Sequence, residues 1–337
     1  MKEKTKRWIM VAVVTVVVGV VGLNVLAYNH AWAMMHFTTG GDRTTKPEAL
    51  SALQKVKVLL VGVNIPRPTG NASLSDLAED GKVLKINGPN GITLETWYCD
   101  RGATTPLVIL FHGYSAEKTS LLPEAHALLK LGASVMLVDF RGSGGSSESY
   151  TTIGVRESDD VATVVSFAKE NLSHSGTVLF GQSMGAVAIL RTMHDNDIQP
   201  DAVIVEAVFD TMLNTVRNRF HAMGIPSFPS AELLVFWGGR QWGFDGFRHN
   251  PVDYASSVHC PALFMHGWDD PRATVNEGRR VFDAVSGAKE FVTFDKTGHE
   301  SYCVAHHTEW RTAIKGMIMR AENKALLSDA VNRARER

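Results

Sequence analysis

One serine of this chain lies in a context that can make it a nucleophile. Residues 181–185 read Gly-Gln-Ser-Met-Gly, follow an apolar run at residues 178–180 and precede a segment with helical character. This pattern is typical of a nucleophile elbow, in which two glycines allow a sharp turn that exposes the hydroxyl of Ser183. The helix that follows favours negative charge developing at that point. The alternative is an ordinary strand-to-helix turn in which Ser183 only caps the helix.

A serine hydroxyl needs a neighbouring base, and we expect His299 to supply it. This histidine follows the last predicted strand and precedes the final predicted helix. An acid should orient its imidazole, and two adjacent carboxylates, Asp269 and Asp270, follow the strand predicted over residues 262–266. The order Ser183, aspartate, His299 is the one that a nucleophile elbow on a parallel sheet requires. The sequence therefore predicts acyl transfer by a catalytic triad.

Two backbone amides are candidates for binding the oxyanion of such a reaction. The first is the amide of Met184, the residue after the nucleophile. The second is the amide of Tyr114, which follows the apolar run at residues 107–111 and Gly113, where the main chain can turn closely. A pair of preorganised amides of this kind would stabilise the tetrahedral intermediate.

The elements that must position these residues alternate along the chain. Strands followed by helices imply βαβ units in a mostly parallel sheet, and ligands bind beyond the carboxyl ends of such strands. We predict an α/β fold with a mostly parallel eight-stranded sheet flanked by helices and an antiparallel hairpin at one edge. The predicted strands cover residues 82–87, 92–99, 107–111, 134–140, 177–180, 202–207, 262–266 and 291–294.

Residues 82–320 resemble the α/β-hydrolase superfamily. The elbow is joined by His-Gly at 112–113, by Asp-Phe-Arg-Gly-Ser-Gly-Gly-Ser at 139–146 and by His-Gly-x-x-Asp at 266–270. The resemblance implies that Asp270, three residues past the glycine, is the acid rather than Asp269. Within this superfamily, the sequence is most similar to the bacterial esterase and serine-aminopeptidase-like branch, whose members share a fold and differ in substrate.

The predicted reaction is hydrolysis of a small-molecule carboxylic ester through an acyl-enzyme, with no cofactor and no metal. Residues 210–251 are rich in aromatic and apolar side chains, and we expect them to form a small helical cap. They either contact an apolar or lipid-like substrate or only pack on the sheet. Alternatives are a peptidase or acyltransferase on the same fold, a non-catalytic binding protein, and a metal site on His299, Cys303 and His306.

The N-terminus predicts a membrane anchor. Lys2, Lys4, Lys6 and Arg7 precede a 21-residue uncharged run at residues 8–28, which is long enough to cross a bilayer. Basic residues before the span should hold the N-terminus in the cytoplasm. We therefore expect a single-pass protein of the inner (cytoplasmic) membrane with its catalytic domain on the extracytoplasmic side. The alternative is secretion after cleavage of a signal peptide near Ala33.

Length and composition set the remaining limits. A chain of 337 residues with a net charge of −1 can hold one large α/β domain and does not predict a nucleic-acid partner. Its three cysteines, Cys99, Cys260 and Cys303, are too few for a disulfide framework. The oligomeric state stays open. We expect a basic tip and anchor at residues 1–28, a linker with a helix over 47–63 at 29–81, the hydrolase domain at 82–325 and a C-terminal tail at 326–337.

Overall fold

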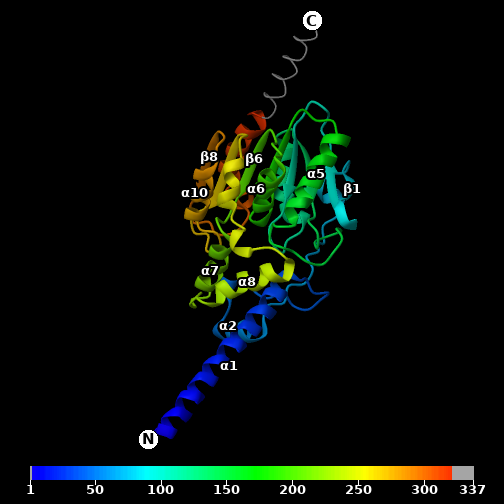
Figure 1. The fold of residues 1–337 in the computed structure, drawn as a ribbon. Coiled ribbons are helices and arrows are strands. Elements are labelled where there is room, and N and C mark those ends of the chain that lie inside the picture. Colours follow the sequence, from blue (N-terminus) through cyan, green and yellow to red (C-terminus); the bar gives the residue numbers. More distant parts are fainter. Residues whose placement is uncertain (1, 321–337) are drawn as a thin grey trace.

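The chain is built on one eight-stranded sheet, shown in Figure 1. The computed structural model describes residues 2–320, so the predicted tail at 326–337 and the last residues of the predicted hydrolase domain lie outside the described residues. The strand order is β1-β2-β4-β3-β5-β6-β7-β8. β2 pairs antiparallel with β1 and β4, and all other neighbours are parallel, which confirms the predicted fold class. The strands are β1 (Lys82–Asn87), β2 (Thr93–Cys99), β3 (Leu107–Phe111), β4 (Ser134–Val138), β5 (Thr177–Gln182), β6 (Ala202–Glu206), β7 (Ala262–Gly267) and β8 (Lys289–Phe294).

Helices cover both faces of this sheet because successive side chains of a strand point to opposite sides. In β3, Ile109 belongs to one apolar core, whereas its neighbours Val108 and Leu110 belong to the other. The first core is closed by α5 (Glu157–Asn171), α6 (Met184–Asn196), α9 (Pro251–Tyr254) and α10 (Val275–Ala284). The second is closed by α3 (Leu74–Leu77), α4 (Leu122–Lys130), α11 (Tyr302–Ala305) and the helical residues 307–320.

Strand β5 is longer than the sequence predicts. It continues for two residues past the predicted end because Gly181 and Gln182 pair with Val205 and Glu206 of β6. The hydrogen-bonded ladder therefore runs up to the residue before Ser183, which holds the start of the turn in place.

The helix predicted over residues 47–63 begins later than expected. Pro47–Ala49 forms one 3-10 turn, Leu50 has an extended backbone, and α2 covers only Ala52–Val61. The cause is a capping box: the Ser51 hydroxyl accepts a hydrogen bond from the Gln54 amide, and the Gln54 side chain accepts one from the Ser51 amide. These bonds satisfy amides that an α-helix leaves unpaired at its start, so the helix starts after Ser51.

Two helices inserted between β6 and β7 lie between the sheet and helices α1 and α2 (Figure 1). They are α7 (Met212–Ala222) and α8 (Ser230–Trp242), within the segment where the sequence predicts a cap. A third apolar core joins them to the segment before α2. It consists of Leu50, Met212, Val216, Phe220, Met223, Ala231 and Val235.

Helix α1 (Lys2–Met35) continues beyond the predicted span at residues 8–28. It projects from the domain in Figure 1, and the part over Glu3–Met35 is long and apolar enough to cross a membrane, by length and composition. Its C-terminal turns pack on α8. Trp237 Nε1 donates to Asn24 Oδ1 at 3.1 Å, and Gln241 Nε2 donates to the Tyr28 carbonyl at 2.8 Å. The cap and the N-terminal helix therefore form one packed unit.

Candidate active site

The turn between β5 and α6 holds Ser183 in a strained conformation. Its φ of 52° and ψ of −112° lie in a region that residues with a side chain rarely adopt. A Cβ atom at Gly181 would lie 2.5 Å from the Ala186 nitrogen, and one at Gly185 would lie 2.2 Å from the Phe111 carbonyl oxygen. Only glycine fits at either position. The sequence Gly-x-Ser-x-Gly is therefore required sterically by this turn.

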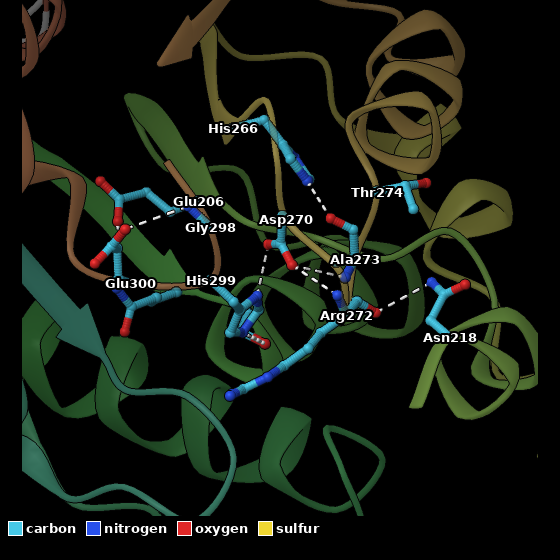
Figure 2. Close-up of polar contacts among 12 residues, drawn as sticks. Glu206, Asn218, His266, Asp270, Arg272, Ala273, Thr274, Gly298, His299 and Glu300 are labelled. Carbon is cyan, nitrogen blue, oxygen red and sulfur yellow. Dashed lines mark hydrogen bonds and ion pairs between the residues drawn. The ribbon is translucent and has the colours of Figure 1, made fainter. Parts of the chain in front are cut away.

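The structure brings the three predicted side chains into one hydrogen-bonded chain. His299 Nε2 lies 3.1 Å from Ser183 Oγ, and its Nδ1 lies 2.6 Å from Asp270 Oδ2. Figure 2 shows the imidazole of His299 beside the carboxylate of Asp270. Residues that are 116 and 29 positions apart in the sequence thus meet at the carboxyl ends of β5, β7 and β8.

Asp270 and Asp269 have different environments. Asp270 is buried, and its Oδ1 accepts hydrogen bonds from the amides of Arg272 at 2.8 Å and Ala273 at 3.1 Å. Burial alone would raise the pKa of Asp270, but the charge and hydrogen bond of His299 outweigh it and hold that pKa below its ordinary value. The carboxyl is therefore ionised at neutral pH. Asp269 is exposed on the same turn.

The two amides predicted to bind an oxyanion flank the nucleophile. Met184 begins α6, and Tyr114 follows Gly113, whose Cβ position lies 3.6 Å from the Ser183 Cβ. Within residues 2–320, neither the Met184 nor the Tyr114 amide donates a hydrogen bond to a protein acceptor, whereas the Ser183 amide donates to the Glu206 carbonyl at 2.8 Å. Two unpaired amides beside Ser183 are what an oxyanion would require.

Known proteins resemble this chain in sequence and in fold. A family model described as "Serine aminopeptidase, S33" matches residues 102–222. The uncharacterized protein YqkD of Bacillus subtilis is 28% identical over 214 residues, which are 62% of this chain and 70% of YqkD. The lysophosphatidylserine lipase ABHD12 of Macaca fascicularis is 24% identical over 212 residues, which are 59% of this chain and 50% of ABHD12.

The structural likeness concerns the fold. The esterase Pf2001 of Pyrococcus furiosus has a TM-score of 0.64 at 24% identity, over 77% of this chain and 98% of the esterase. The chain has the α/β-hydrolase fold. The proteins that this chain resembles are described as an esterase, a lipase and a serine aminopeptidase.

His112 orders the loop of this α/β-hydrolase that carries the Tyr114 amide. The Phe140 amide donates to His112 Nε2 at 3.1 Å, so the proton of the neutral ring is on Nδ1, which donates to the Gly113 carbonyl at 2.8 Å. Burial lowers the pKa of His112 and keeps the ring neutral. The His-Gly motif predicted this loop. The sequence did not indicate that the His112 ring holds the loop in place through its two hydrogen bonds.

Two buried carboxyl groups near Ser183 were not found by sequence reasoning. Glu206 ends β6 and accepts a hydrogen bond from Trp310 Nε1, and Glu124 accepts one from the Ser301 hydroxyl (Figure 2 shows Glu206). Burial and the neighbouring charge of Glu124 raise the pKa of Glu206 to about 8. Burial likewise raises the pKa of Glu124. At neutral pH this pair therefore holds at least one proton. An acidic residue at the end of an apolar strand was the signal available in the sequence.

The residues of the alternative metal site do not converge. His299 contacts Ser183 and Asp270, His306 Nε2 contacts the Thr297 hydroxyl, and Cys303 is buried in the second core. Within residues 2–320, no three His, Cys, Asp or Glu side chains are grouped to hold an ion.

Proposed function

We propose that this α/β-hydrolase is a serine hydrolase that cleaves carboxylic esters. The observation that carries the proposal is the unbroken path of hydrogen bonds from Ser183 through His299 to Asp270. A strained elbow, an ionised acid and two unpaired amides around that path support it. Each of these features has a distinct part in acyl transfer.

In the proposed reaction, His299 Nε2 takes the proton of the Ser183 hydroxyl as the oxygen attacks the ester carbonyl. Asp270 stabilises the imidazolium, and the amides of Met184 and Tyr114 bind the oxyanion. His299 then gives the proton to the leaving alcohol. A water molecule repeats the sequence on the acyl-enzyme, which releases the acid and restores Ser183.

We propose apolar or lipid-like esters as substrates. Support comes from the cap, whose helices contribute Val216, Phe220, Met223 and Leu234 to an apolar cavity beside the site. The related ABHD12 is a lysophosphatidylserine lipase by name, which agrees with a substrate of this kind.

We also propose that α1 anchors the protein in the inner membrane, with the hydrolase domain on the extracytoplasmic side. Beside α1, helix α2 exposes Leu53, Val56, Leu60 and Val61, an apolar surface suited to the edge of a bilayer. Cleavage near Ala33 would remove Ala31, which is buried in the packed unit of α1 and α8. Digestion of intact spheroplasts by protease tests the orientation, because a domain left undigested would contradict it.

A peptidase is the second candidate, since the matching family model is described as a serine aminopeptidase. The same hydrogen-bonded path can attack an amide carbonyl. Turnover of matched p-nitrophenyl esters and aminoacyl p-nitroanilides separates the two. Faster hydrolysis of the anilides would replace the esterase proposal.

The decisive experiment combines a probe with a variant. We expect a fluorophosphonate probe to label Ser183 in the full-length protein. The substitution Ser183→Ala should abolish the labelling and lower kcat/KM for p-nitrophenyl butyrate by about 10⁴-fold or more. The unfolding temperature should change little, because the strained turn is retained. A correctly folded Ser183→Ala protein with wild-type turnover would end the proposal.

A further inference from the structure

A cavity of about 190 Å³ lies beside the active site, between the end of α1, the segment before α2, α2 itself and the cap. Two of its lining residues belong to the site region. These are Tyr114, whose amide is a proposed oxyanion donor, and Arg272, whose amide binds Asp270. The remaining wall is mainly apolar and includes Met34, Leu50, Leu59, Phe220, Met223 and Leu234.

The charged residues of this wall all have the same sign. They are Arg43, Lys46, Arg219 and Arg272, and no Asp or Glu lines the cavity. Arg272 forms an ion pair with Glu48, which lies outside the lining. The chain as a whole has a net charge of −1, so this cluster does not follow from a basic composition. The cavity combines an apolar wall with excess positive charge.

Arg219 is one of the cations of this wall that form no ion pair among the described residues. Its Nη1 donates to the carbonyl of Thr215 at 2.6 Å and to the hydroxyl of that residue at 2.7 Å. Among the described residues no carboxylate forms an ion pair with it. Burial lowers the pKa of Arg219, and the charges of Asp270 and Glu48, neither of which forms an ion pair with it, do not offset this cost of removing the guanidinium from water. A bound anion would remove that cost.

Arg43 lies close to the same point. Its Nη2 donates to the carbonyl and hydroxyl of Ser115, each at 2.8 Å. Burial raises the pKa of the Tyr114 hydroxyl, and the charges of Arg219 and Arg43, which line the same cavity, both oppose that rise. His30 adds a further polar group, because its buried Nε2 has no hydrogen-bond partner within residues 2–320.

We propose that this cavity binds the substrate, and that Arg219 and Arg43 select esters that combine one hydrocarbon chain with an anionic group. The inference rests on the proposed esterase function and names its substrate class. The apolar wall accommodates the chain, and the two guanidiniums bind a phosphate or carboxylate close to Tyr114. Neither arginine touches Ser183 or His299, so both are specificity-determining residues.

The test uses the full-length protein in detergent micelles and three esters with the same oleoyl chain. Monooleoylglycerol is uncharged, oleoyl lysophosphatidylglycerol carries a phosphate, and oleoyl glycolate carries a carboxylate. We expect wild-type kcat/KM to be at least about tenfold higher for one or both anionic esters than for the uncharged one. The ester with the higher value identifies the anion.

Substitutions then test which residues determine the preference for anionic esters. Arg219→Gln should lower the anionic-to-uncharged ratio by about tenfold or more, Arg43→Gln should lower it less, and Arg219→Lys should retain part of it. Arg248→Gln is the matched control, because the Arg248 side chain is 89% exposed on the cap surface and forms an ion pair with the neighbouring Asp245. That control should leave the ratio unchanged.

The outcomes separate this inference from the function on which it rests. If wild-type protein hydrolyses none of the esters and the probe does not label Ser183, the esterase proposal fails. If it hydrolyses all three equally well, or if a folded Arg219→Gln protein keeps the wild-type ratio, only the selection of anionic esters fails. Thermal unfolding of each variant establishes that it is folded.

Discussion

The rim that carries Ser183, His299 and Asp270 differs from the cavity wall beside it. At the rim, the three side chains are hydrogen-bonded to one another, and the backbone turns are fixed by glycines or strand pairing. In the cavity wall, by contrast, Arg219 forms no ion pair and His30 Nε2 lacks a hydrogen-bond partner within residues 2–320. The comparison indicates that the rim is preorganised for one reaction, whereas the wall is incomplete without a ligand.

The family match contributes to both regions, since Tyr114 and Arg219 of the wall lie inside it and Asp270 and His299 of the rim lie outside it. The family model covers residues 102–222, which include the elbow and end with α7. The cavity wall adds α1, α2 and α8, which lie outside that match.

The largest expected effect is the loss of catalysis when the rim is altered. Asp270→Asn should lower kcat/KM for all esters by about 10³- to 10⁴-fold, because an amide cannot hold the His299 tautomer or stabilise the imidazolium. Asp269→Asn is the matched control, since it makes the same change on an exposed neighbour. Steady-state kinetics on p-nitrophenyl butyrate measures both. Equal losses in the two variants would contradict the assignment of the acid.

A smaller effect should come from the contact between α1 and the cap. A Cβ at Gly238 would already lie 3.4 Å from Met35 Sδ and 3.9 Å from Ala31 Cβ, so Gly238→Leu should push α1 away from α8 and distort the cavity. We expect kcat/KM for an oleoyl ester to fall about tenfold, while p-nitrophenyl acetate is hydrolysed at the wild-type rate.

Gly316→Leu is the control for that substitution, because Gly316 has open space at its Cβ position. An identical fall for the acetate and the oleoyl ester would show that Gly238→Leu damages the rim and not the wall.

The effect expected to be smallest on activity concerns the buried pair behind the rim, which acts on stability. The pKa of Glu206 is raised to about 8 in the folded protein, so the folded state binds a proton that the unfolded state releases above about pH 4.3. Stability should therefore fall as pH rises from about 5 to 8, by up to about 1.4 kcal/mol per pH unit. Glu206→Gln should reduce this slope, as measured by urea unfolding at several pH values. An unchanged slope would mean that Glu206 is ionised in the folded protein.

Much of the rim could be predicted from the sequence because its determinants are local. Apolar runs located the strands, and Ser183, Asp270 and His299 each follow one of them. The turn after β7 was ambiguous, since two adjacent aspartates are equivalent in sequence and only the fold directs one of them inward.

The wall could not be predicted in the same way because it depends on contacts between distant segments. Nothing near Arg219 in the sequence indicates that it meets Arg43, since α7 and the segment before α2 come together only in the folded protein. The start of α2 was predicted wrongly for a local reason. Pro47 suggested a helix start there, whereas the capping box of Ser51 sets the actual start. The pairing of Glu206 with Glu124 likewise depends on the sheet.

The unbroken course of α1 has a practical consequence for work on this protein. Residues 30 and 34 of this helix line the cavity, and residue 35 packs on α8, so a shortened protein that starts after the helix would lack one side of the cavity. Such a version could keep a working triad and still give a misleading substrate profile. In the proposed topology, the seven helical steps from Tyr28 to Met35 also place the cap within roughly 10 Å of the bilayer surface. Solubilising the whole chain is therefore preferable to trimming it.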